Sequence, residues 1–241
     1  MDYHDALADL CVGSAHPGGY LATLAWLATV DFQAGMRVLE VGCGTGRTAC
    51  QIASYPGVLV TAVESRTSML DRARKRAQDS GVEVTFRLVD SERLPFDSRT
   101  FDLVVAESVT VFNDVPALLQ EYARVLVPGG IAIDTEMCAA APLPEEVMEA
   151  FHRTYGALRV PTQTQWKGLW RAAGFDPVRV LSSGPVTMDP ARGDIPDLWS
   201  ITQTPVHDQE VWRIVEQNQM VMSDHAKWLQ YAVIRATRQT E

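Results

Sequence analysis

Between residues 36 and 137, short apolar runs alternate with segments whose apolar residues recur at helical spacing. The runs are rich in β-branched residues, as in strands that are buried on both faces of a parallel sheet. The predicted strands are Met36–Val41, Val58–Glu64, Glu83–Val89, Phe101–Ser108 and Gly130–Glu136, and the predicted helices are Gly46–Ser54, Thr67–Ser80 and Asp114–Leu126. This alternation is typical of an α/β fold with a mostly parallel sheet and right-handed crossovers.

Two further regions flank the alternating segment. Residues 1–35 predict two helices, and Pro17 suits the first turn of the second helix. After residue 137, the pattern predicts helices near 144–158, 162–173 and 207–224, strands at Phe175–Ser182 and Trp228–Ala236, and a loop over 183–197. Because the late segment is too short to build a core of its own, we expect a single domain over 1–241, divided into 1–35, 36–137 and 138–241.

Charge and cysteine content argue against several classes of protein. The 241 residues include 21 Lys and Arg against 30 Asp and Glu, a formal net charge of −9, whereas nucleic-acid binding usually leaves a basic footprint. The four cysteines show neither a CxxC pair nor zinc spacing with histidines, so we expect no metal site. Without a signal peptide or an apolar stretch of membrane-spanning length, we expect a cytoplasmic protein.

The segment that carries candidate chemistry is Glu40-Val41-Gly42-Cys43-Gly44-Thr45-Gly46. A predicted buried strand runs into three alternate glycines, and a helix begins at the last one, which is a design for holding a nucleotide-like cofactor. The dinucleotide fingerprint G-x-G-x-x-G requires glycine at the position of Arg47. The carboxylate of Glu40, two residues before the first glycine, suits an ammonium better than a pyrophosphate.

At these residues the sequence resembles the class I S-adenosylmethionine (SAM)-dependent methyltransferases, most closely the small-molecule branch that includes quinone-biosynthesis-like enzymes. The resemblance extends over about residues 36–136. Beside the glycine segment, it rests on Glu64 at the end of the second strand, Asp90–Phe96 after the third, Phe101–Val105 in the fourth, and Arg124–Gly130 before the fifth. Several motifs in the family's order make chance agreement improbable.

The resemblance implies an enzyme with a Rossmann-like, seven-stranded, mostly parallel sheet and helices on both faces. It also implies an N-terminal helical lid, a SAM-binding core over 36–137, and substrate-side helices with an insertion near the C-terminus. Glu64 is expected to accept the ribose hydroxyls, Asp90 the adenine amino group, and Met69 to pack on the adenine. The expected cofactor-binding residues are Glu40, Gly42, Cys43, Gly44, Gly46, Glu64, Ser65, Met69, Asp90, Ser91 and Glu107.

Candidates for the acceptor side come from the strand ends and the N-terminal helices. Glu107 and Glu136 are expected to meet at the mouth of the sheet, as a base or as a collar for a positive substrate; capping of neighbouring helices is the alternative. His16 is a candidate to contact the cofactor or to act as the base, and a structural contact is the alternative. The expected catalytic residues are His16 and Glu107, and the expected substrate-binding residues are Tyr3, Tyr20 and Glu136.

The sequence therefore predicts in-line methyl transfer from SAM to a small organic acceptor, through O, N, C or S. The alternatives are a protein or RNA methyltransferase, a SAM-binding protein without catalysis, and a dinucleotide-dependent oxidoreductase. As partners we expect a small-molecule acceptor, with neither nucleic acid nor membrane, and the protein is expected as a monomer or homodimer.

Overall fold

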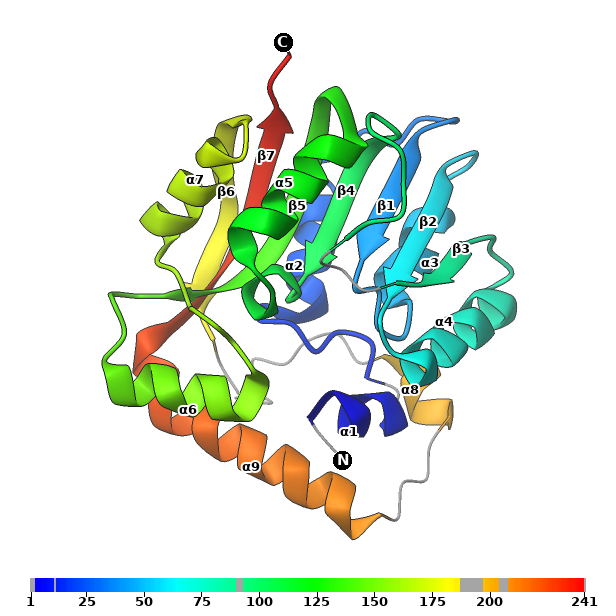
Figure 1. The fold of residues 1–241 in the computed structure, drawn as a ribbon. Helices are drawn as coiled ribbons and strands as arrows, with labels where there is room; N and C mark the ends of the chain where they lie inside the picture. Colours follow the sequence, from blue (N-terminus) through cyan, green and yellow to red (C-terminus); the bar gives the residue numbers. More distant parts are fainter. Residues whose placement is uncertain (1–2, 11, 90–92, 187–196, 204–207, 241) are drawn as a thin grey trace.

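Seven strands form one mixed sheet in the computed structural model, in the order β3-β2-β1-β4-β5-β7-β6 (Figure 1). The structure describes residues 3–10, 12–89, 93–186, 197–203 and 208–240. All pairs are parallel except those that β7 makes with β5 and β6. The strands are β1 (Arg37–Val41), β2 (Leu59–Glu64), β3 (Thr85–Leu88), β4 (Phe101–Glu107), β5 (Leu126–Ala139), β6 (Phe175–Pro185) and β7 (Leu229–Arg238).

Helices cover both faces of this sheet, which confirms the expected Rossmann-like class. The helices are α1 (Tyr3–Asp9), α2 (Gly19–Leu27), α3 (Arg47–Ala53), α4 (Thr67–Ser80), α5 (Val115–Val125), α6 (Glu145–Tyr155), α7 (Gln163–Ala172), α8 (Leu198–Gln203) and α9 (Gln209–His225). Trp26, Ile52 and Leu70 anchor α2, α3 and α4 in one apolar core, while Tyr122 and Trp170 anchor α5 and α7 in the other. Helices α1, α6, α8 and α9 lie beyond the carboxyl ends of the parallel strands (Figure 1).

The best-predicted helix is α4, whose observed bounds match the prediction from its apolar spacing. It ends at Gly81, which adopts the left-handed conformation (φ 67°) that favours glycine after a helix. Helix α5 begins one residue later than predicted, because Asp114 serves as the N-cap and accepts a hydrogen bond from the Ala117 N–H at 3.2 Å.

Two strands are longer than the sequence predicts. Strand β5 begins at Leu126 instead of Gly130, because Leu126 pairs with Phe101 and a register shift in the ladder accommodates the following Pro-Gly-Gly segment. Strand β6 continues to Pro185, where it still pairs with Gln230 of β7. The predicted loop over 183–197 is therefore wrong at its start, and residues 187–196 lie outside the described residues.

Two helical predictions also need correction. Helix α2 begins at Gly19, after Gly18 in the left-handed conformation (φ 87°), so Pro17 precedes the helix instead of occupying its first turn. The short helix α8 was not predicted as a separate element. Among the described residues, we find no helix that is both long and apolar enough to cross a membrane.

Candidate functional site

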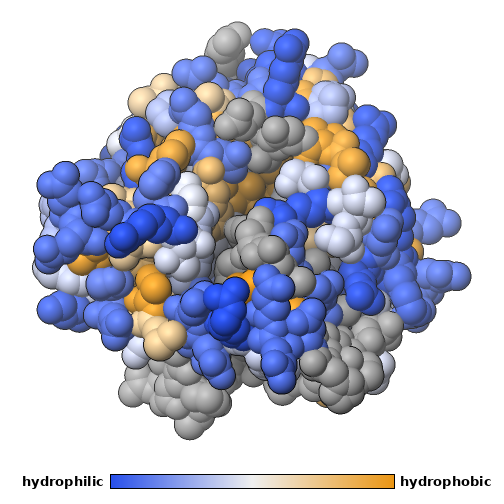
Figure 2. Space-filling model, turned by 60° about the horizontal axis from the view of Figure 1, so that its bottom comes forward, coloured by the Kyte–Doolittle hydropathy of each residue, from blue (hydrophilic) through white to orange (hydrophobic). Residues whose placement is uncertain are grey.

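A cavity of about 950 Å³ opens at the carboxyl ends of the strands. Its wall combines the glycine segment after β1, the turn after β2, the end of β4, residues 12–19, and parts of α6, α9 and β7. Figure 2 looks onto this end of the molecule and shows apolar residues within a hollow, surrounded by a mostly hydrophilic surface. The volume is near the upper end of the roughly 300–1,000 Å³ range for small-molecule sites.

The three glycines after β1 differ in what surrounds them. A Cβ on Gly42 would approach Val109 to 2.3 Å, and a Cβ on Gly46 would lie 2.8 Å from the Cβ of Ala73 in α4. A Cβ on Gly44 (φ 51°) would meet no atom within 4 Å, and this residue borders the cavity. Close packing therefore accounts for Gly42 and Gly46, whereas Gly44 leaves the backbone open to a ligand.

Glu40 brings a buried carboxylate to the cavity wall. The residue is only 3% exposed, and none of the described residues hydrogen-bonds its Oε2 atom. Burial, then the nearby Glu107 and Glu64, raises the pKa of Glu40 well above its ordinary value. Because an unpaired buried carboxylate is costly, this oxygen fits the ammonium of a bound ligand such as the methionine part of SAM.

Glu64 ends β2 and is held by hydrogen bonds from its own turn. Its Oε1 atom accepts the backbone N–H groups of Ser65 (2.8 Å) and Arg66 (3.0 Å), and its Oε2 atom accepts that of Gly44 (3.0 Å). These contacts fix a carboxylate on the cavity wall, where it fits the paired ribose hydroxyls of SAM.

The other predicted cofactor residues fall into two groups. Ser65, Met69 and Cys43 line the cavity, and Met69 packs against Leu7 of α1. Burial raises the pKa of the Cys43 thiol well above its ordinary value, so this side chain is a neutral wall group rather than a nucleophile. Asp90 and Ser91 lie outside the described residues.

Glu107 joins the end of β4 to helices α2 and α3. Its Oε1 atom accepts hydrogen bonds from the Thr23 hydroxyl (2.7 Å) and the Trp26 indole N–H (2.9 Å), and its Oε2 atom accepts one from the Thr48 hydroxyl (2.7 Å). Its side chain is 7% exposed and borders the cavity. No signal in the sequence indicated these three donors, which come from two separate helices.

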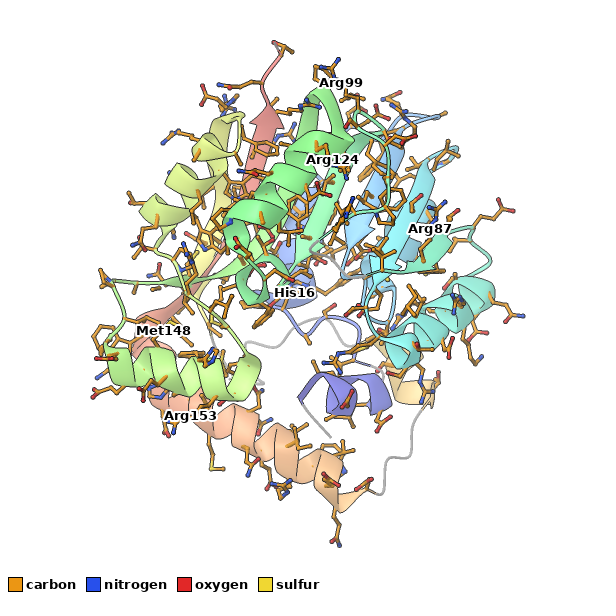
Figure 3. All side chains as sticks on the ribbon, viewed as in Figure 1. His16, Arg87, Arg99, Arg124, Met148 and Arg153 are labelled. Atoms are coloured by element: carbon orange, nitrogen blue, oxygen red, sulfur yellow. The ribbon has the colours of Figure 1, made fainter. Side chains whose placement is uncertain are left out.

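His16 lies on the cavity wall beside Glu107. Its Nε2 atom is 3.6 Å from the Glu107 Oε2 atom and 3.2 Å from the Thr23 hydroxyl oxygen. The Thr23 hydroxyl donates its hydrogen to Glu107, so its oxygen can only accept a hydrogen bond from the Nε2 atom of His16. Nε2 must therefore carry a proton. In the neutral ring, Nδ1 is then the basic nitrogen. Figure 3 shows His16 at the carboxyl ends of the central strands.

Glu136 lies on the opposite face of the sheet from Glu107. In the β4–β5 ladder, Glu107 pairs with Thr135, so Glu136 projects to the other face and the expected meeting of the two glutamates is wrong. Its Oε1 atom accepts the backbone N–H groups of Val109 (2.8 Å) and Thr110 (2.7 Å). The side chain is fully buried and is not among the residues lining the cavity, and burial raises its pKa to about 7.

Of the two predicted tyrosines, the structure describes only the side chain of Tyr20, and it does not bring Tyr20 into the site. Tyr20 is not among the lining residues: its ring lies 3.5 Å from the Arg47 guanidinium, and its hydroxyl donates to Gln51 at 3.1 Å. These contacts tie α2 to α3. Tyr3 begins α1, and its side chain lies outside what the structure describes.

Several cavity residues from late elements were not among the predicted site residues. They include Asn218 and Met222 of α9 and Tyr231 of β7, whereas Tyr155 of α6 was considered only as one of several aromatic residues that could cover a substrate. The Tyr155 hydroxyl donates to the Asn218 side-chain oxygen, so that α6 and α9 are linked across the cavity wall. Single aromatic and amide residues in a helix carry no signal of a site, since most of them pack in cores.

Comparisons with known proteins agree with this geometry. A family model described as a methyltransferase domain matches residues 38–130. The uncharacterized methyltransferase YodH of Bacillus subtilis is 33% identical over 189 residues, which cover 78% of this chain and 80% of that protein. The O-methyltransferase resE of Aspergillus sclerotiorum is 32% identical over 153 residues, covering 61% and 58% of the two chains.

Solved structures share the fold at lower sequence identity. Phosphoethanolamine N-methyltransferase 2 of Haemonchus contortus, in complex with SAM, superimposes with a TM-score of 0.74 at 19% identity; the match covers all of this chain and 60% of that protein. Geranyl diphosphate C-methyltransferase of Streptomyces coelicolor A3(2) gives a TM-score of 0.66 at 18% identity, with 91% and 79% coverage. On the family match and the similarity to YodH, the chain belongs to the class I SAM-dependent methyltransferases.

Proposed function

We propose that this methyltransferase acts on a small organic molecule, and that Glu40, Gly44 and Glu64 hold SAM. The observation that carries the assignment is the buried, unpartnered Glu40 oxygen next to the open backbone of Gly44. In this arrangement Glu40 binds the methionine ammonium and Glu64 the ribose hydroxyls. The names of the neighbours from Haemonchus and Streptomyces, which refer to phosphoethanolamine and geranyl diphosphate, support an acceptor of similar size.

Methyl transfer from SAM requires the protein mainly to orient the acceptor and to exclude water. When bound, SAM supplies an activated methyl group whose leaving group is a neutral thioether. The chain must then hold the acceptor in line and keep water out. We assign α1 and residues 12–18, together with α6 and α9, as the lid that does this, because residues 12–18, Tyr155 and Asn218 border the cavity opposite the sheet. Helix α2, which the sequence also assigned to the lid, packs instead on a face of the sheet through Trp26.

His16 and Glu107 form the proposed proton-accepting pair. Glu107 holds the imidazole with Nε2 protonated, so Nδ1 of His16 takes the proton of an acidic acceptor group. Glu107 acts as a positioning residue, because its oxygens already accept three hydrogen bonds. Glu136 is buried within β5 and accepts hydrogen bonds from the backbone of the loop after β4 instead of contacting substrate.

The proposal is tested by calorimetric titration with SAM and with NADH. We expect SAM binding without NADH binding. Glu40→Gln should weaken SAM binding by about 10- to 100-fold, since a charge-assisted hydrogen bond contributes about 1.5–3 kcal/mol. An ammonium favours the ionised Glu40, whose pKa is raised in the free protein, so SAM affinity should rise with pH in the wild type and less in the variant.

The matched control is Glu83→Gln, which changes an exposed glutamate outside the cavity. This variant should keep the wild-type affinity for SAM. Equal SAM affinity in Glu40→Gln and in the wild type contradicts the ammonium assignment, and binding of NADH in place of SAM contradicts the proposal as a whole.

A further inference from the structure

The lining residues that come from β4 to β7 form one half of the cavity, here called the acceptor half. The proposed SAM contacts come instead from the glycine segment and the turn after β2, and the two parts of the lining meet where Val109 packs against Gly42. Aromatic, thioether and aliphatic side chains dominate it, with Phe112, Met137, Tyr155, Val186, Met222 and Tyr231 as its largest apolar surfaces.

Charge is scarce in the acceptor half. Among its described lining residues, Glu107 is the only Asp, Glu, Lys, Arg or His, and its carboxylate already accepts hydrogen bonds from Thr23, Trp26 and Thr48. In Figure 3, Arg99 and Arg124 lie toward the opposite end of the sheet from His16, and Arg153 is exposed on α6. A phosphate therefore finds no described Lys or Arg here, and the imidazole of His16 on the adjoining wall already contacts Glu107 and Thr23 through Nε2. An ammonium finds no uncommitted carboxylate.

Tyr231 is held in the wall of the acceptor half by two glycines. A Cβ on Gly18 would lie 2.9 Å from the ring's Cδ2 atom, and a Cβ on Gly184 would lie 3.1 Å from its Cε1 atom. The ring is thus enclosed at opposite edges by backbone from two distant segments. No described residue hydrogen-bonds its hydroxyl, which leaves this group for a ligand.

We infer that the acceptor half binds an uncharged, mainly apolar molecule that bears a hydroxyl, and that Tyr231, positioned by Gly18 and Gly184, orients it. This inference rests on the proposed function. The acceptor oxygen bonds to the methyl carbon as the carbon–sulfur bond breaks, its electron pair remains on sulfur, and the hydroxyl proton passes to Nδ1 of His16. The product is a neutral methyl ether.

Three probes on one ring system test this class: naphthol, naphthyl phosphate and naphthylmethylamine, which is an ammonium at neutral pH. Each is titrated into protein saturated with S-adenosylhomocysteine. We expect naphthol to bind at least about tenfold more tightly than either charged probe, since the described residues of the acceptor half offer no uncommitted counter-charge. Incubation with SAM should give methoxynaphthalene, detected by mass spectrometry.

Variants separate the role of Tyr231 from general stability. Gly184→Ala should weaken naphthol binding by about threefold or more, because the Tyr231 ring must shift. Tyr231→Phe should weaken naphthol binding by about 3- to 10-fold, which is the effect of losing one hydrogen bond. Both should keep S-adenosylhomocysteine affinity within about twofold. Gly168→Ala is the control, because a Cβ there meets no atom within 4 Å.

The outcomes distinguish the two proposals. Failure of the wild type to bind S-adenosylhomocysteine overturns the cofactor assignment. If S-adenosylhomocysteine binds, three results overturn the acceptor inference alone. The first is a charged probe that binds as tightly as naphthol, and the second is that naphthol does not bind. The third is that the Gly184→Ala and Tyr231→Phe variants both bind naphthol with the affinity of the wild type.

Discussion

At the scale of single residues, His16 shows how a neighbour decides the chemistry of a side chain. A histidine next to a proline has two tautomers available, and sequence alone favours neither. Thr23 donates its hydrogen to Glu107 and thereby presents an acceptor to Nε2 of His16. The basic nitrogen is therefore Nδ1, which lies 3.4 Å from the Pro17 carbonyl oxygen that can accept the new N–H after protonation.

The tautomer of His16 is directly measurable. We expect nitrogen NMR of the imidazole to show a protonated Nε2 and an unprotonated Nδ1 in the neutral ring, with the signals assigned by their loss in His16→Gln. Removal of the base should slow methyl transfer to naphthol by about 10²-fold, with S-adenosylhomocysteine affinity unchanged. A neutral ring protonated on Nδ1 contradicts the hydrogen-bond argument, and an unchanged rate assigns His16 to structure.

At the scale of elements, the loop after β4 depends on a carboxylate from the neighbouring strand. The chain turns there through Val109 and a 3-10 turn at Thr110–Phe112, and its backbone N–H groups are satisfied by Glu136. This loop supplies Val109, which packs over Gly42, and Phe112, which lines the cavity. Glu136 thus acts on the site through the backbone of the loop.

Glu136 also makes a pH-dependent contribution to stability. Burial raises the pKa of Glu136 from 4.5 to about 7, and burial together with Glu136 raises the pKa of the neighbouring Asp134 as well. The stability that neutral Glu136 contributes is therefore complete below about pH 4.5 and is lost as pH rises through about 7, and Asp134 adds a loss of the same sign. The loss from Glu136 has a limit of about 1.4 kcal/mol per pH unit. Glu136→Gln keeps an acceptor for the N–H groups, so its free energy of unfolding should fall less across this range.

Urea unfolding at several pH values measures this difference. Glu146→Gln, an exposed position in the first turn of α6, is the control and should follow the wild type. If Glu136→Gln shows the same decline with pH as the wild type, the decline arises elsewhere in the protein.

At the scale of the whole molecule, a buried ion pair joins the chain's distant parts. The Arg76 side chain of α4 is 6% exposed, and it contacts Asp197 before α8 at 2.6 Å and donates to the Thr45 carbonyl oxygen at 2.9 Å. The Thr45 hydroxyl in turn donates to the Val12 carbonyl oxygen at 3.1 Å. The glycine segment, the N-terminal region and α8 are therefore held by one network around Arg76.

Breaking this network should loosen the N-terminal region. Asp197→Asn leaves Arg76 buried without its counter-charge, a change that costs about 3 kcal/mol in buried pairs. We expect faster hydrogen exchange across residues 5–18. The control, Asp71→Asn, removes an exposed ion pair with Arg74 and should change exchange little. Unchanged exchange in Asp197→Asn would show that other contacts hold the region.

Much of this protein follows from local sequence patterns. Apolar runs and helical spacing predicted the strands of the parallel core, and α4 to its exact bounds, because its core-facing residues and Gly81 lie within one stretch of chain. The glycine segment with Glu40, and Glu64 at the next strand end, were predicted to lie at one site for the same reason, and they do line one cavity. Parallel strands bring such neighbours to one edge of the sheet.

Only the tertiary structure decided the rest of the site. The strand register separated Glu107 from Glu136, because adjacent positions in a strand point to opposite faces. Packing of α2 and α3 supplied three donors to Glu107, and the approach of α6, α9 and β7 brought Tyr155, Asn218 and Tyr231 to the cavity. These contacts join residues far apart in sequence, so no local pattern determines them, and they form the part of the cavity to which we propose that the acceptor binds.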